Sequence, residues 1–261
     1  AFVADVVPAE HRARAYNTLY WAINVGFSIA PIAAGVVATF SYRALFLGDA
    51  LTSFVFGTII LLRVHETHPD LANRSSAGIR EVLRDHTFVW FWFCALIQSF
   101  VVFQMTTTLS GWMSAQGYGP GAYGAVLAIN GIEIVLLQPF VGEYVKRWKP
   151  MNVCAVSALL MGIGFSFHGV SSLLAMHGVA VGVWTLGEIL NAPIASSFVA
   201  NRAPPLLRGR YQGIYAMSWG LSGCLAPIVG PRVLAIDPSL LWGGCAVLGM
   251  VAAIGYRQIK S

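Results

Sequence analysis

Two glutamates lie in the middle of long uncharged stretches of this sequence. Glu133 ends the segment Asn130-Gly-Ile-Glu133, and Glu188 begins the segment Glu188-Ile-Leu-Asn191. An ionised carboxylate in an apolar environment is costly unless it faces a cavity, pairs with another group or binds a proton. We therefore predict that both glutamates couple to protons or contact a substrate, together with Asn130 and Asn191. The alternative is a protonated glutamate that only hydrogen-bonds between helices.

The elements that must position these glutamates are long apolar helices. The 261 residues are 57% hydrophobic and only 10% charged, against about 25% charged in an ordinary soluble domain. A helix needs about 20 apolar residues to cross a membrane, and stretches of that length recur through the chain. We predict spans at 14–39, 44–62, 87–114, 120–145, 151–173, 177–200, 211–235 and 239–256. The expected fold class is an all-α polytopic membrane protein.

The charged residues orient these spans. When the breaks between spans are assigned to alternate sides, one side receives only Arg43 and Arg232 and the other receives the remaining 14 of the 16 Lys and Arg residues. The positive-inside rule makes the richer side cytoplasmic. The net charge of +5 therefore reflects topology and does not indicate nucleic acid as a partner. A multi-pass protein of the inner (plasma) membrane is expected.

The sequence contains an internal repeat. Ala30-Pro31-Ile32 recurs 196 residues later as Ala226-Pro227-Ile228, and each copy follows a short basic turn. The turns match as well, because Arg12 aligns with Arg208 at the same offset. Since 196 residues hold six spans and their loops, both copies run in the same direction. Parallel repeats of six helices predict two similar bundles related by an axis along the membrane normal.

One long polar segment divides the two bundles. We expect residues 64–86 to form a cytoplasmic linker, with a short amphipathic helix at 79–84. Residues 87–261 then form a six-helix C-terminal bundle, and residues 1–63 the end of an N-terminal bundle. By the repeat length, that first bundle lacks its first three helices and most of its fourth.

Polar and aromatic residues at helical spacing predict a cavity between the bundles. A lining of rings, amides and thioether suits flat, amphipathic organic compounds. The members of this set are Asn17, Tyr20, Asn24, Gln98, Met105, Tyr215 and Trp219. A packing stripe is an equally good explanation for any single member. His168, near the outer end of its helix, is expected to be an interfacial residue.

The repeated motifs also carry a family resemblance. Residues 5–15, beginning Asp5-Val-Val-Pro8, resemble the loop between helices four and five of major facilitator superfamily transporters of the drug:proton antiporter type. Residues 26–35, Gly-Phe-Ser-Ile-Ala-Pro-Ile-Ala-Ala-Gly, resemble the antiporter motif G-x-x-x-G-P-x-x-G-G on helix five, with two glycines replaced by alanine. Residues 207–213 resemble the loop before helix eleven. Lys146 departs from the family, since it occupies the acidic position of the loop between helices eight and nine.

The resemblance implies roles for the residues that match. The small residues and prolines of the two copies would form kinked, closely packed helices that gate the outward end. This gating motif comprises Gly26, Ala30, Pro31, Gly35, Ala226 and Pro227. The matching cytoplasmic loops contribute Asp5, Arg12, Arg208 and Arg210. A generic kinked packing helix is the alternative for each copy.

The expected function is proton-coupled efflux of small amphipathic organic compounds by alternating access. The partners are then a small-molecule substrate, the proton and the lipid bilayer, and the protein acts as a monomer without a cofactor or metal. No nucleophile elbow, H-E-x-x-H or phosphate-binding glycine loop indicates an enzyme. Two alternatives stay open: a non-transporting membrane sensor or binding protein on a transporter scaffold, favoured by Lys146, and an inactive truncated fragment.

Overall fold

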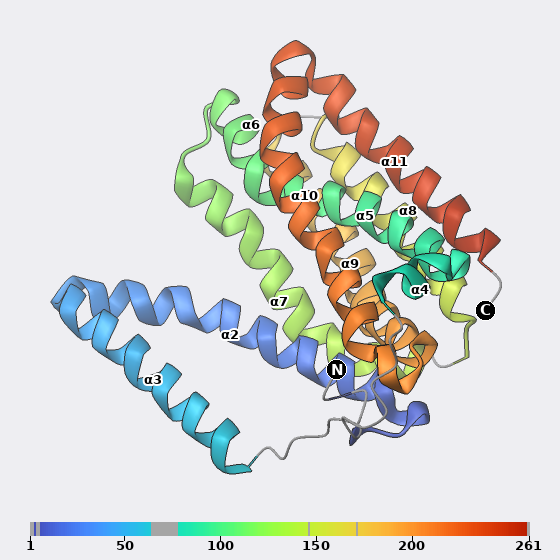
Figure 1. Ribbon diagram of the computed structural model, residues 1–261. Coiled ribbons are helices and arrows are strands. Elements are labelled where there is room, and N and C mark those ends of the chain that lie inside the picture. The colour runs from blue at the N-terminus through green and yellow to red at the C-terminus, as the bar shows by residue number, and fades with distance from the viewer. Residues whose placement is uncertain (1–2, 4–5, 64–77, 146, 171, 260–261) are drawn as a thin grey trace.

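In the computed structural model, residues 3, 6–63, 78–145, 147–170 and 172–259 are described, except for the side chains of 27–28, 30–36, 38–40, 42 and 142–143. Helices make up the architecture of this part of the chain (Figure 1). The long helices are α2 (Arg12–Phe40), α3 (Tyr42–Arg63), α5 (His86–Thr107), α7 (Pro120–Val145), α8 (Pro150–Phe167), α9 (Leu174–Arg202), α10 (Arg208–Ile236) and α11 (Pro238–Gln258). The short ones are η1 (Ala9–His11), α4 (Ile79–Arg84), α6 (Leu109–Ala115) and η3 (Pro205–Leu207).

Seven of the described helices are long and apolar enough to cross a membrane. They coincide with seven of the eight predicted spans and confirm an all-α polytopic membrane protein. The eighth predicted span, 14–39, coincides with α2, a helix of 29 residues that includes side chains outside the described set. The predicted span 87–114 is divided at Thr108, where α5 ends and α6 begins.

The internal repeat is also present in the backbone. The turn η1 and helix α2 begin and end 196 positions before η3 and α10, and both helices have 29 residues. The preceding prolines have almost the same backbone angles, φ −54° and ψ 147° at Pro8 and φ −55° and ψ 146° at Pro204. Both helices end in extended residues, Ser41 and Asp237. The two copies therefore share one local fold.

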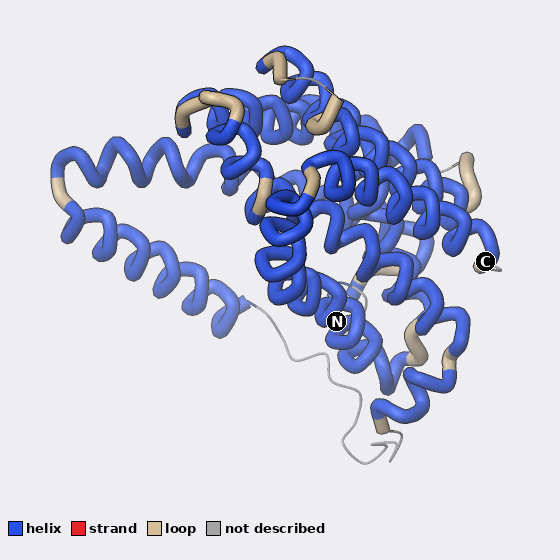
Figure 2. The backbone as a smooth tube through the Cα atoms, turned by 90° about the horizontal axis from the view of Figure 1, so that it is seen from above, coloured by secondary structure: helices blue, strands red, loops and turns tan. Residues whose placement is uncertain are grey.

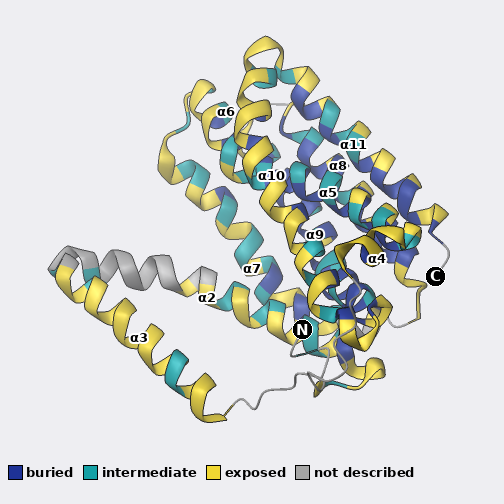
Figure 3. Cartoon of the chain, in the orientation of Figure 1, coloured by how far each residue is buried: buried dark blue, intermediate teal, exposed yellow. Residues whose placement is uncertain are grey.

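The hairpin of α2 and α3 projects from the remaining helices. In Figures 1 and 2, α3 diverges from the bundle, while the first part of α2 lies against it. Helix α2 packs on α7 and α9, whereas α3 packs mainly on α2. Figure 3 shows α3 exposed along its length, and Phe46, Leu61 and Leu62 are each at least 70% exposed. Because α3 is apolar and exposed over most of its surface, it requires an apolar surrounding such as lipid or further helices.

Two clusters of buried side chains form the core of the remaining helices. One contains Phe91, Cys154 and Tyr256, and the other contains Phe165 and Trp184. Helix α8 packs tightly on α9 at Gly164 and on α11 at Gly162. An added side-chain carbon would lie 2.5 Å from the backbone of α9 at the first position and 2.8 Å from the backbone of α11 at the second. In lipid the hydrophobic effect does not drive helices together. Close van der Waals contact between small residues stabilises the helix pairs instead.

Prolines inside α7 and α9 free two backbone carbonyls, and neighbouring helices satisfy both. Pro139 cannot bond the carbonyl of Val135 four residues earlier, and Nε1 of Trp21 on α2 donates to that oxygen at 3.0 Å. Pro193 frees the carbonyl of Ile189 in the same way. Nε2 of Gln138 on α7 donates to that oxygen at 3.2 Å. Each proline therefore creates an acceptor that joins two helices.

A carboxylate at the start of α5 ties three helices together. Asp85 accepts two hydrogen bonds from Arg202, each at 2.7 Å, and others from the Phe88 amide at 3.2 Å and the Tyr211 hydroxyl at 3.0 Å. Partial burial by itself raises the pKa of Asp85. The hydrogen bonds and the charge of Arg202 more than offset that effect, so the pKa is lowered from its ordinary value. The preceding helix, α4, occupies the predicted segment 79–84.

Candidate functional site

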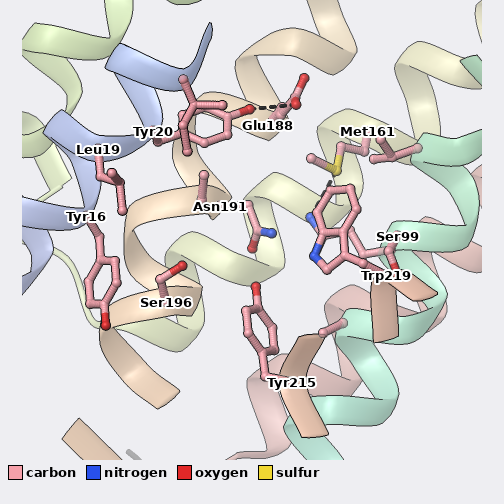
Figure 4. Close-up of a pocket in the computed structure, with 15 residues that line it drawn as sticks. Tyr16, Leu19, Tyr20, Ser99, Met161, Glu188, Asn191, Ser196, Tyr215 and Trp219 are labelled. Carbon is pink, nitrogen blue, oxygen red and sulfur yellow. Dashed lines mark hydrogen bonds between the residues drawn. The ribbon is translucent and has the colours of Figure 1, made fainter. Parts of the chain in front are cut away.

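A pocket of about 220 Å³ lies between α2 and the helices α5, α8, α9 and α10. Figure 4 shows side chains from these helices converging on it. Its lining is mainly apolar and aromatic, with a few polar groups, as in most small-molecule sites. The residues that line it are Tyr16, Leu19, Tyr20, Ile23, Ala95, Gln98, Ser99, Val102, Met161, Glu188, Asn191, Ala192, Ser196, Tyr215 and Trp219.

Glu188 is the only acidic residue among those that line this pocket. The Tyr20 hydroxyl donates to its Oε1 at 2.5 Å, and Nδ2 of Asn130 donates to its Oε2 at 3.0 Å (Figure 4). The Asn130 amide also donates to the Thr185 hydroxyl at 3.0 Å. Both oxygens of the carboxyl group thus have a donor, one from the first repeat copy and one from α7. These two donors hold the carboxyl group in position.

Asn191 offers the pocket an acceptor. Its Oδ1 is buried and has no hydrogen-bond partner among the described residues, and Figure 4 shows the side chain directed toward the space shared with Tyr215 and Ser196. Gln98 is different. Its Nε2 donates to Ser157 at 2.7 Å, and its Oε1 accepts from Tyr256 at 3.0 Å. The oxygen of Asn191 can therefore accept a hydrogen bond from a ligand. Gln98 only lines the pocket, because both of its polar atoms already have partners.

Glu133 lies on α7, one turn from Asn130, but does not line this pocket. It is half-buried and forms no hydrogen bond or ion pair with a described residue. A side-chain carbon added at Gly182 of α9 would lie 3.6 Å from its Oε2. The structure thus brings Glu188 and Asn130 together and leaves Glu133 facing the surface of α9.

Three residues of the predicted cavity lining are elsewhere. Asn17 is buried against α7, where Gln138 donates to its Oδ1 at 2.5 Å and it donates to the Gln138 carbonyl at 2.9 Å. Asn24 donates to the Tyr20 carbonyl at 2.9 Å, and Met105 packs on a buried cluster. Helical spacing identified a shared face but not which neighbour covers it. Tyr20, Gln98, Tyr215 and Trp219 of the same prediction do line the pocket.

The sequence family follows from comparison with known proteins. The family model described as Major Facilitator Superfamily matches residues 1–227. The chain belongs to the major facilitator superfamily. It is 23% identical to a Na(+), Li(+), K(+)/H(+) antiporter of Planococcus maritimus, over 88% of this chain and 62% of that protein. It is 24% identical to Multidrug resistance protein 2 of Bacillus subtilis (strain 168), over 100% of this chain and 68% of that protein.

A solved structure supports the fold of this family member. The human organic anion transporter MFSD10 (TETRAN) superimposes with a TM-score of 0.77 at 16% identity, covering 98% of this chain and 65% of that one. This likeness concerns the fold alone. The chain spans 62% of the length of the Planococcus maritimus antiporter and 59% of the length of the MFS-type transporter YttB of Bacillus subtilis (strain 168), which is about three fifths of each protein.

The superfamily motifs have different surroundings in the two repeat copies. In the second copy, Ser222, Ala226 and Gly230 are buried, and Ser222 hydrogen-bonds with Ser99 of α5 at 2.8 Å. Pro227 lies on the exposed side of α10. In the first copy Gly26 is exposed. Ala30, Pro31 and Gly35 fall within α2, but their side chains lie outside the described residues.

The cytoplasmic-loop motif joins the two copies directly. Nη1 of Arg12 donates to Oδ1 of Asn201 at 2.7 Å, and Nε of Arg12 donates to the Val7 carbonyl at 3.1 Å. Arg208 is half-buried and Arg210 is exposed. Asp5 lies outside the described residues. Arg12 of the first copy thus bonds to Asn201 in the last turn of α9, just before the segment that begins the second copy.

A histidine pair was missed by the sequence analysis. His168, expected near the outer end of its helix, is the residue that follows α8, and its side chain is fully buried. Its Nδ1 lies 2.9 Å from Nδ1 of His177, whose Nε2 lies 2.8 Å from Oε1 of Gln116. The turn between α8 and α9 folds His168 inward, and no periodicity within one helix could indicate that. Nine of the 15 pocket residues were also not predicted, and four of these carry a polar or sulfur atom in the side chain: Tyr16, Ser99, Met161 and Ser196.

Proposed function

We propose that the full-length protein is a proton-coupled exporter of small amphipathic organic compounds that works by alternating access. The pocket lies between α2 of the first repeat copy and the helices α5, α8, α9 and α10. Glu188 is the coupling residue, and Asn191 and the aromatic side chains contact the substrate. The relative named as a cation/H(+) antiporter supports the proton coupling, and the relative named as a multidrug resistance protein supports the export of organic compounds.

The bond from Tyr20 to Glu188 carries the proposal. A phenol donates more strongly to a carboxylate than to a neutral carboxyl group. Loading a proton on Glu188 therefore weakens a contact between α2 and α9. Releasing the proton strengthens it again. Proton binding and helix separation are linked in this way, as coupling requires.

The proposal assigns the parts of the chain to two bundles. Residues 1–63 contribute the end of an N-terminal bundle, residues 64–86 a cytoplasmic linker, and residues 87–261 a C-terminal bundle of six helices. Rocking of these bundles would expose the pocket to each side in turn. The transporter is proposed to act as a monomer.

The test is proton-driven transport by the full-length protein in sealed vesicles. Glu188→Gln keeps the shape of the side chain but removes titration. We expect substrate binding and downhill exchange to survive in this variant, while uphill export is lost. Glu133→Gln tests the second glutamate in the same assay.

Glu81→Gln is the matched control, because Glu81 is an exposed carboxylate of the short helix α4, outside the pocket and outside the long apolar helices. It should pump as the wild type does. Normal uphill export by Glu188→Gln would refute its role as the coupling residue, and normal export by Glu133→Gln as well would place the coupling group outside both residues. Loss of substrate binding in Glu188→Gln would instead assign the carboxylate to the substrate.

A further inference from the structure

A groove runs along the outer surface of α8 and α11, away from the pocket described above. Its volume is about 390 Å³. The two helices are antiparallel, so the start of α8 lies beside the end of α11. The residues that line it are Trp148, Asn152, Ala155, Val156, Leu159, Met250, Ala253, Ile254 and Arg257.

The groove exists because the two helices meet through small residues. A side-chain carbon on Gly162 would lie 2.8 Å from the Gly249 Cα, and one on Gly249 would lie 2.6 Å from the Ala158 carbonyl oxygen. Because the two backbones are in direct contact, no side chains fill the space above the line where the helices meet. Closer to the start of α8 and the end of α11, the small buried residues Ala155 and Ala253 form the bottom of the groove.

The walls of the groove are apolar and open to the outside. Val156 and Leu159 project from α8 with 36% and 37% exposure, and Met250 and Ile254 project from α11 with 55% and 53%. Because both helices are membrane spans, these side chains meet the hydrocarbon of the bilayer. A flexible acyl chain fits such a narrow apolar channel.

One end of the groove is polar and positively charged. Arg257 and Asn152 lie there, beside Trp148, whose ring is 51% exposed. No described residue forms an ion pair or hydrogen bond with the guanidinium of Arg257. Lys149 is adjacent in the sequence, and this end lies on the side that the charge distribution predicts to be cytoplasmic. Tryptophan at the end of a span is typical of the headgroup layer.

We propose that this groove is a binding site for one anionic phospholipid of the cytoplasmic leaflet. Its acyl chain lies over Ala155 and Ala253, and its phosphate binds Arg257, which presents a planar set of donors suited to phosphate oxygens. Basic sites between membrane helices on the cytoplasmic side bind anionic headgroups in this way. The site is separate from the transport pocket.

The test is lipid retention by the purified full-length protein, measured by native mass spectrometry after detergent extraction and addition of phosphatidylglycerol or phosphatidylcholine. The wild type should retain phosphatidylglycerol about fivefold better, as expected for one arginine near the membrane surface. Arg257→Gln should abolish that preference. Val156→Phe, which fills the channel from an exposed wall, should reduce retention of both lipids.

Arg43→Gln, which removes an exposed arginine at the other end of the molecule, is the matched control and should bind lipid as the wild type does. An unchanged preference in Arg257→Gln would overturn the proposal. So would normal retention in Val156→Phe, because the lipid would then be held by diffuse charge. Displacement of the lipid by millimolar inorganic phosphate would also overturn it, since the site would recognise a free anion.

Discussion

The hydroxyl of Tyr20 lies 2.5 Å from Oε1 of Glu188, although 168 positions separate the two residues. Tyr20 belongs to the helix that follows the first basic turn, and Glu188 to a helix between the two copies of the repeat. Under the proposed alternating-access mechanism, the contact connects parts of the chain that would move relative to one another. Its loss should affect transport more than folding.

Tyr20→Phe removes the donor and keeps the ring. We expect the rate of proton-driven export to fall about tenfold, which corresponds to one charge-assisted hydrogen bond. In a Glu188→Gln background the same change should have little further effect, because the charged acceptor is gone. Transport rates of the four variants measure this. Equal effects of Tyr20→Phe in both backgrounds would show that the two residues act independently.

Trp21→Phe removes the donor to the carbonyl that Pro139 frees. The expected loss is about 1 kcal/mol of unfolding free energy in the natural background. Pro139→Ala restores an amide that can bond the Val135 carbonyl within α7, so Trp21→Phe should then have almost no effect. Thermal unfolding of the single and double variants measures this coupling.

Trp90→Phe provides the control for that cycle, since Nε1 of Trp90 donates to the Gly255 carbonyl at 3.0 Å without a proline nearby. Its effect should be the same with and without Pro139→Ala. If the effects of Trp21→Phe and Pro139→Ala simply add, the indole does not compensate for the proline.

Ala226→Leu enlarges a fully buried residue where α10 packs against α5. Overpacking of this kind costs about 1–3 kcal/mol, and we expect both lower stability and impaired export. Val229→Leu enlarges a residue of the same helix that is 38% exposed, and should be tolerated. Thermal unfolding and vesicle transport of the two variants give the comparison. Full export by Ala226→Leu would contradict a gating role for this face.

Asp85→Asn should lower the unfolding free energy at neutral pH by about 1 kcal/mol, the usual value for an exposed ion pair. Because the pKa of Asp85 is lowered in the folded protein, the stabilisation is present above the unfolded pKa of about 3.9. It is lost as the pH falls through the lower folded value. The melting temperatures of wild type and variant should thus converge below about pH 4.

Glu10→Gln is the control for this titration, since Glu10 is an exposed residue of η1. It should melt as the wild type does at each pH. A gap between Asp85→Asn and wild type that stays constant down to pH 2 would assign the loss to packing.

Cysteine labelling tests the topology. In a background without the four native cysteines, Tyr118→Cys should react with an impermeant reagent from outside, and Lys149→Cys from the cytoplasm. The charge distribution underlies this expectation. Reaction of position 118 from the cytoplasm alone would reverse the orientation.

Much of the fold was predictable because the repeat and the apolar lengths are properties of single segments. The matching bounds of α2 and α10 follow from the matched turns that precede them. The neighbours of a side chain were less predictable. Asn17 and Tyr20 lie on one face of α2, yet the first contacts Gln138 and the second Glu188. Spacing gives the face, while the crossing of the helices decides its partners.

The site was predictable to the same extent. Glu188 and Asn130 could be singled out as candidates because a polar side chain in an apolar span is costly unless it has a partner, and the structure places the two in contact. The roles of Trp21 and Gln138 could not, since their acceptors are backbone atoms exposed by prolines on other helices. The pairing of His168 with His177 was not predictable either, because the turn after α8 sets the direction of the His168 side chain.

The two proline-freed carbonyls also have an evolutionary consequence. A side chain that donates to such a carbonyl is useful only while the proline is present, and the proline is tolerated more easily while the donor is present. Positions 21 and 139 are therefore expected to change together among relatives, as are positions 138 and 193. Each pair joins two helices. Correlated substitutions at these positions would therefore indicate which helices remain in contact across the relatives.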